Sequence, residues 1–217
     1  MRGLIFVFAL AGVLAAQGKG LSARDLFLER DGTEGRARLG VRYRLLEVEI
    51  ATGRAVAVDP ETNFATGTCL AVELESNRAA NVFVFNWGSS GAWQILLPAS
   101  RLANESNRIS AAVVVRVPRE HCFQVEGKKG VDSLLVVVTD RVEDIEKLNA
   151  AIRDTGEPGE DGPRLMAALD GRRPGEMASR DLKVERDRPK GAGFVYAVSS
   201  VARAADRVRM EIRIRHE

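Results

Sequence analysis

Short segments rich in alternating or β-branched apolar residues, separated by turn residues, run from residue 37 to residue 139. Residues 37–50 have the period of two that is typical of a strand with one buried face, because apolar side chains alternate with arginines. The further predicted strands are a short one near residue 57 and the segments 68–76, 81–87, 93–98, 111–118, 121–126 and 133–139. The strands are short and closely spaced and do not alternate with helices, so the chain predicts a mainly β fold, an antiparallel β-sandwich of the immunoglobulin-like kind.

The pattern changes after residue 140. Residues 141–153 place apolar side chains at helical spacing and predict one amphipathic helix. Residues 154–191 hold four of the seven prolines and many charges, which indicates a charged, mobile loop excursion. Two closing strands are predicted within residues 194–215. We therefore expect one domain over residues 21–217.

The first residues predict export. Arg2 precedes an apolar run that matches the hydrophobic region of a signal peptide and is too short to span a bilayer. Small residues at Val13 and Ala15 predict cleavage after Ala15 or Ala16, so residues 1–16 are interpreted as a signal peptide. The alternative is an N-terminal core helix or an uncleaved anchor. The arginine-rich composition suggests a bacterial protein, either periplasmic or extracellular, with no transmembrane segment after cleavage.

Charge and cysteine content narrow the possible chemistry. A net charge of +2 is too balanced to indicate a nucleic-acid partner. Cys69 and Cys122 both lie in predicted strands, and in an exported chain they could form one disulfide or remain two half-buried thiols. His121 and His216 are the only histidines and have no metal-ligand spacing, so we expect no metal site and no cofactor.

The stretch FNWGSSGAWQILLP contains two tryptophans around a Gly-Ser-Ser-Gly turn. It departs from the G-x-S-x-G nucleophile elbow, and a strand rather than a helix follows it. The pattern therefore predicts a β-hairpin, with Gly88 and Gly91 at positive φ and both tryptophans packed across it. The tryptophans are either core residues or part of an exposed aromatic patch. On the second interpretation the candidate binding surface consists of Trp87, Ser89, Ser90 and Trp93, with residues 99–108 beside it.

A stripe of arginines marks the last strand, where Val208, Met210, Ile212 and Ile214 should face inward. The outward-facing arginines are Arg207, Arg209, Arg213 and Arg215. They either bind an anionic glycan, lipid or nucleic acid, or form a solvated face that protects an edge strand from aggregation.

Three landmarks in order, VDPETNFATGTCLAVELESN, NVFVFNWGSSGAWQILLPASRLANESNRI and VVRVPREHCFQVEGKKGVDSLLVVVTDR, resemble the family known as domain of unknown function 4384. The resemblance covers residues 58–141, and the segments LSARDLF and RVRMEIRIRH are similar to the flanks of exported single-domain members. It implies a β-sandwich that occurs alone or beside caspase-like peptidases and kinases, which suggests a binding or sensing module. It implies no catalytic residues.

Taken together, these features predict a non-catalytic, exported module that binds a protein or another envelope component whose identity the sequence leaves open. One alternative is a hydrolase of unknown type that uses Asp, Glu and His121 as its acid–base groups. Another is a purely architectural envelope domain. The oligomeric state is not predicted.

Overall fold

The computed structural model of the chain describes most of the residues after residue 20. The described residues are 21–29, 38–98, 107–127, 129–153, 165, 167–169, 182–187, 191–200 and 207–217. The predicted signal peptide 1–16, most of the predicted excursion 154–191 and most of loop 99–108 lie outside them.

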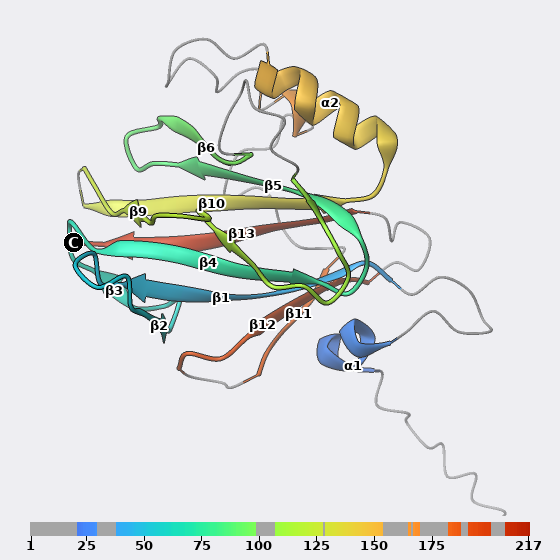
Figure 1. The fold of residues 1–217 in the computed structure, drawn as a ribbon, viewed down its shortest axis with the longest axis horizontal. Helices are drawn as coiled ribbons and strands as arrows, with labels where there is room; N and C mark the ends of the chain where they lie inside the picture. The colour runs from blue at the N-terminus through green and yellow to red at the C-terminus, as the bar shows by residue number, and fades with distance from the viewer. Residues whose placement is uncertain are drawn as a thin grey trace, which may run out of the picture.

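Two β-sheets form the body of the protein (Figure 1). The first sheet has the order β11 (Leu182–Arg186), β12 (Val195–Ser199), β1 (Gly40–Val48), β4 (Cys69–Ser76) and β8 (Val115–Val117), with β2 (Ala55–Val58) paired to β1 and β9 (Phe123–Gln124) paired to β4. The second has the order β3 (Asn63–Phe64), β13 (Arg207–His216), β10 (Gly130–Thr139), β5 (Ala80–Trp87) and β6 (Trp93–Leu97), with β7 (Arg108–Ile109) paired to β5. The pairing is antiparallel except between β13 and the short β3.

The main apolar core lies between the two sheets and takes alternate residues from both. On β10, Leu134, Val136 and Val138 point into this core, whereas Leu135 and Val137 point to the outer face. All five are at most 1% exposed, because both faces of β10 are covered. The predicted β-sandwich is confirmed, and its most apolar segment is a strand buried on both faces.

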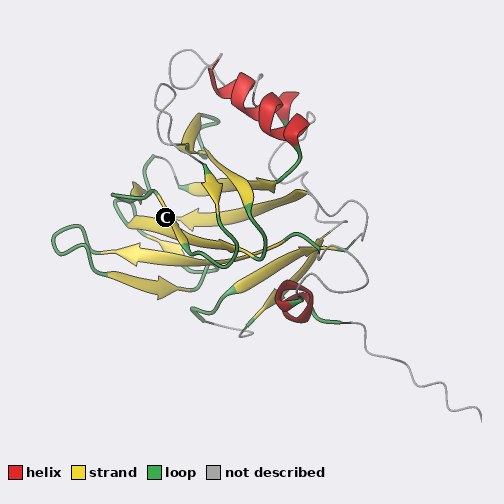
Figure 2. Cartoon of the chain, turned by 45° about the vertical axis from the view of Figure 1, so that its right-hand side comes forward, coloured by secondary structure: helices red, strands yellow, loops and turns green. Residues whose placement is uncertain are grey.

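Two helices cover the outer faces on opposite sides of the sandwich (Figure 2). Helix α2 (Val142–Arg153) packs on the second sheet, where Leu148, Ile152, Leu165 and Leu169 close a second apolar cluster over β5 and β10. Helix α1 (Ala23–Leu28) packs on β12 of the first sheet. None of the helices in the described part of the chain has the length and apolar composition needed to cross a membrane.

The predicted helix 141–153 and the two closing strands are confirmed. The predicted strand 111–118 is wrong over its first half, because the chain turns there and Ala112 has a φ of 58°. The amide of Ala112 donates to the carbonyl of Ser76, the last residue of β4, so pairing begins only at Val115. In the predicted strand 121–126 only Phe123–Gln124 forms a strand, and Val125 adds backbone hydrogen bonds to Gly67 and Thr68. A run of β-branched residues does not show where its partner strand ends.

Helix α1 and strand β11 were not predicted as such, and neither were the two-residue strands β3 and β7. Helix α1 has only 6 residues and begins with a capping box in which Ser22 and Asp25 bond each other's backbone amide and side chain, each over 3.0 Å. Strand β11 lies inside the segment 154–191, which was interpreted as a charged, mobile loop excursion with no strand. Strand β11 lies at the edge of its sheet, where charged side chains are common. Its sequence LKVER therefore lacks the strong apolar alternation of an internal strand.

Candidate functional site: a trough on the second sheet

The predicted hairpin joins β5 to β6 through a turn at residues 88–91. Two backbone hydrogen bonds close it, from Gly91 N to Gly88 O over 2.8 Å and from Gly88 N to Ala92 O over 2.9 Å. Gly91 has a φ of +85°, which glycine adopts at no steric cost. The prediction of a positive φ at Gly88 is wrong, since one left-handed residue suffices for this turn. Strand β6 follows directly, so the turn is not the strand-to-helix elbow of a serine hydrolase.

The two tryptophans pack across this hairpin, as predicted, but differ in exposure. Their ring centroids lie 4.8 Å apart with an angle of 46° between the ring planes. Trp93 is only 4% exposed and belongs to the apolar cluster beneath α2, so its assignment to an exposed binding surface is wrong. Trp87 is half-buried and packs against that cluster. Of the two tryptophans, only Trp87 can therefore present an aromatic surface to a ligand.

The strand register places Trp87 in a row that crosses the second sheet. Trp87 lies opposite Trp93 on one side and opposite Ser133 of β10 on the other. Ser133 lies opposite Arg213 of β13. Residues directly opposite each other on antiparallel strands project from the same face. Neighbouring strands are about 4.8 Å apart, so the strands that carry Trp87 and Arg213 are separated by roughly 10 Å. Only the small Ser133 lies between the two large side chains.

This large–small–large row forms an open depression, here called the trough, with a volume of about 240 Å³. Its lining residues are Trp87, Gly88, Ser89, Val131, Ser133, Glu211 and Arg213. The Ser133 hydroxyl donates to Glu211 Oε1 over 2.7 Å. The trough thus has an aromatic wall, a hydroxyl-bearing floor and an opposite wall with one carboxylate and one guanidinium. It unites the predicted hairpin surface with the predicted arginine stripe.

Ser89 of the hairpin turn contacts two polar side chains, Asp132 and His216, at the end of the sandwich core. Its amide donates to Asp132 Oδ1 over 2.6 Å, and its hydroxyl lies 3.5 Å from His216 Nε2. His216 Nε2 also lies 3.5 Å from Asp132 Oδ1. The sequence suggested no position for His216 near the turn. The signal that was available is the alternation of β13, which puts residue 216 on the inner face after Val208, Met210, Ile212 and Ile214.

The same three residue types occur in serine hydrolases, but the geometry here differs. In a Ser-His-Asp triad the serine and the carboxylate contact opposite nitrogens of the imidazole. Here both approach Nε2, while Nδ1 is buried and has no hydrogen-bond partner among the described residues. The His216 side chain is 0% exposed. The arrangement suits anchoring of the hairpin turn, with Asp132 as the acceptor for Ser89. Ser90 is exposed at the tip and lines no part of the trough.

The predicted arginine stripe is divided by its surroundings. Arg207 Nη1 donates to Asp144 Oδ1 of α2 over 3.1 Å, and Arg209 Nη1 donates to the carbonyl of Leu169 over 3.4 Å. Arg207 thus ties α2 to β13, and Arg209 ties the backbone at Leu169 to the same strand. The exposed members of the stripe are Arg213 and Arg215. Only Arg213 lines the trough.

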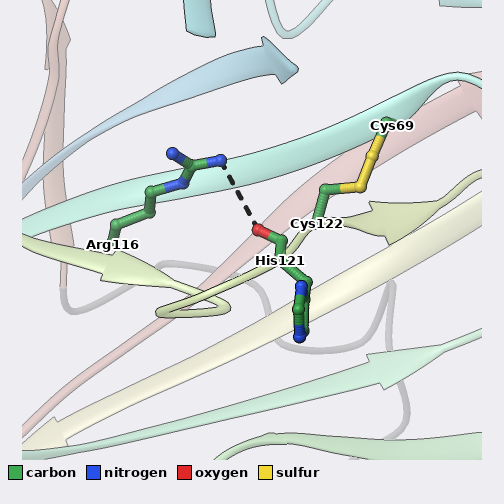
Figure 3. The surroundings of a disulfide bond; sticks show 4 residues. All are labelled: Cys69, Arg116, His121 and Cys122. Carbon is green, nitrogen blue, oxygen red and sulfur yellow. Dashed lines mark hydrogen bonds between the residues drawn. A yellow bond between two sulfur atoms is a disulfide. The ribbon is translucent and has the colours of Figure 1, made fainter. Parts of the chain in front are cut away.

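Cys69 of β4 and Cys122 form a disulfide, with their Cα atoms 5.5 Å apart (Figure 3). Of the two alternatives that the sequence left open, the structure contains the cross-link. His121 is next to it and is exposed, and its carbonyl oxygen accepts a hydrogen bond from Arg116 Nη2 over 3.4 Å (Figure 3). This histidine belongs to the β8–β9 connection of the first sheet, not to the trough on the second.

A larger and shallower hollow of about 390 Å³ lies beside β7 and β8. Its lining residues are Arg108, Ile109, Ser110, Val113, Val114, Val115, Arg116 and Arg119. Arg108, at the end of the neighbouring loop 99–108, lies in it, whereas Trp87, Ser89, Ser90 and Trp93 do not. Within the described part of the chain, no three His, Cys, Asp or Glu side chains are grouped so that they could hold a metal ion.

Residues 63–141 match the family model described as Domain of unknown function (DUF4384). A search of curated proteins found no match, and a search of solved structures found none either. The matched segment runs from β3 to the end of β10 and contains the hairpin, the disulfide and the floor of the trough. The wall formed by Glu211 and Arg213 comes from β13, outside the match. The resemblance to this family that the sequence suggested is therefore confirmed over residues 63–141.

Proposed function

We propose that this protein is a non-catalytic, exported binding module of a bacterial envelope or secretome, and that its ligand sits in the trough. The observation that carries the proposal is the cross-strand row from Trp87 over Ser133 to Arg213. It combines an aromatic side chain with a few converging polar groups in a concave site, as small-ligand sites commonly do. The exposed Arg213 has no ion-pair or hydrogen-bond partner among the described residues, so it can meet a ligand without first breaking a contact.

Export is the second part of the proposal. The supporting features are the apolar run preceded by Arg2 and the disulfide, since disulfides persist mainly in oxidising compartments. Mass spectrometry of the protein from its native host tests this part. We expect a mature chain that begins after Ala15 or Ala16. A chain that still begins at Met1 would contradict export by a cleaved signal peptide.

The test of the binding site is capture from the envelope and secreted fractions of the native host with three immobilised proteins. They are the mature wild type, Trp87→Ala and Arg215→Gln. Arg215 is an exposed arginine two positions from Arg213 on the same face of β13, and it does not line the trough. Trp93 is left unchanged, because its burial makes an alanine there a core defect rather than a surface change.

We expect Trp87→Ala to lose a component that the wild type and Arg215→Gln retain in equal amounts. Circular dichroism and thermal unfolding of each variant establish that it is folded before capture. Equal retention by all three proteins would place binding elsewhere and contradict the proposal for the trough.

A further inference from the structure

We propose that the trough binds an acidic sugar unit, a pyranose ring that carries a carboxylate. This inference rests on the proposed binding function and names the ligand class of the same site. The charges of the trough give the first argument. Arg213 is an exposed guanidinium without a partner among the described residues, and guanidinium groups match carboxylates in a two-point geometry. An anionic group on the ligand would supply that partner.

The carboxylate of Glu211 narrows the choice of anion. It lies two residues from Arg213 on the same face of β13 and lines the same trough. A bare anion such as phosphate would be repelled by this negative charge. A ligand that has hydroxyl donors in addition to its acid group can use Glu211 as an acceptor. Ser133 also lines the trough, and its hydroxyl oxygen, which donates its proton to Glu211, can accept a hydrogen bond from the same kind of ligand.

Trp87 supplies the apolar surface that a sugar ring needs. One side of its indole is backed by Trp93 at a centroid distance of 4.8 Å, which holds the ring in place. The faces of aromatic rings carry partial negative charge and attract the weakly positive C–H groups of a flat ring. A pyranose has such a C–H face, whereas an acidic peptide or a free fatty acid has no comparable flat face beside its carboxylate.

The dimensions of the trough agree with one ring. Its volume of about 240 Å³ is below the lower end of the range of about 300–1,000 Å³ that is typical of drug-sized ligands. The strands that carry Trp87 and Arg213 are roughly 10 Å apart, two strand spacings, so a ring stacked on the tryptophan can direct its carboxylate toward the arginine. The open shape also admits a ring that is part of a longer polysaccharide.

The experiment measures binding of defined probes to the mature wild type by isothermal titration calorimetry. The probes are trigalacturonate, the neutral maltotriose, the anionic peptide triglutamate and monomeric galacturonate. We expect trigalacturonate to bind at least tenfold more tightly than maltotriose and triglutamate. Affinity of galacturonate within threefold of the trimer would indicate that one ring fills the site, and a stronger preference for the trimer would indicate a polysaccharide as the source. Both of these results support an acidic sugar.

Three variants link the affinity to the trough. Arg213→Gln should lower trigalacturonate binding to the level of maltotriose, because it removes only the partner of the carboxylate. Trp87→Ala should lower the binding of every sugar at least tenfold. Ser133→Leu should do the same, because the larger side chain fills the floor and the hydrogen bond to Glu211 is lost. Arg215→Gln removes one positive charge outside the trough and should bind trigalacturonate like the wild type.

Equal affinity of the wild type for trigalacturonate and maltotriose would overturn the acidic assignment. Equal affinity for triglutamate would overturn the sugar assignment, as would the absence of binding of any sugar to the folded wild type. In each of these cases the proposed binding function stands if Trp87→Ala still loses a captured component. If Trp87→Ala captures the same components as the wild type, that result contradicts the proposed binding function independently of the sugar measurements.

Discussion

Removing the disulfide between Cys69 and Cys122 should cost this protein a large part of its stability. The cross-link joins positions 53 residues apart. A loop of this size restricts the unfolded chain enough to contribute about 4 kcal/mol to the free energy of unfolding, according to the loop-closure relation. Globular domains unfold with only about 5–15 kcal/mol, so the protein without its disulfide should be marginally stable.

The assay is equilibrium unfolding in urea, followed by tryptophan fluorescence, for the oxidised wild type, the reduced wild type and Cys69→Ala/Cys122→Ala. At an m-value of about 2 kcal/mol/M, the midpoint should fall by about 2 M in both disulfide-free forms. The reduced wild type is the matched control, because it retains the buried sulfur of Cys69 and lacks only the covalent bond.

Two results would refute this reasoning. A difference between the urea midpoints of the oxidised and reduced wild type that corresponds to less than about 1 kcal/mol of unfolding free energy would be one. It would show that the unfolded chain gains little freedom from reduction. Titration of two thiols in the denatured, unreduced protein would show that the bond is absent.

Three further predictions concern buried groups. Asp140→Asn should destabilise the protein by about 3–5 kcal/mol in urea unfolding, because it removes the negative charge 2.7 Å from the guanidinium of Arg78, which is only 8% exposed. Arg24→Gln, in an exposed ion pair, should cost under about 1 kcal/mol. Burial raises the pKa of Tyr43 from 10.0 to about 12. The contribution of this tyrosine to the free energy of unfolding is therefore fully present below pH 10 and is lost as the pH rises toward 12. Between pH 9 and 11.5 the wild type should therefore lose about 2 kcal/mol more than Tyr43→Phe, and equal losses would contradict the assignment. Trp93→Ala should cost about 3–5 kcal/mol in the same assay, and a cost under 1 kcal/mol would mean that this indole is not a core residue in solution.

Much of the fold could be predicted because the sheets bury one face of most strands. The alternation in β1, β4 and β13 predicted which side chains face the core, and the structure confirms it for Val41, Leu70 and Ile212 among others. The elements that were missed are short or peripheral. Helix α1 depends on one capping box, and β11 is an edge strand whose charged residues resemble a loop.

The candidate site could be predicted only in parts. The hairpin and the arginine stripe were both identified from local pattern, but nothing in the sequence indicated that Trp87 and Arg213 would share one row. That depends on the pairing of β5 with β10 and of β10 with β13, which together bring Trp87 beside a strand that lies more than 100 residues later in the sequence. The packing of α2 on the second sheet buries Trp93, and the pairing of β10 with β13 brings His216 to the end of the sheet where Ser89 lies.

The sequence by itself determined the β-rich class, the inward-facing residues of the main strands, the α2 helix and the hairpin turn. These features follow from the period of the side chains and from turn chemistry, which act over a few neighbouring residues. Only the tertiary structure decided the disulfide, the division of the arginine stripe and the trough. Each of these depends on which strands pair and in which register, and a shift of one residue would move Trp87 or Arg213 to the other face of the sheet.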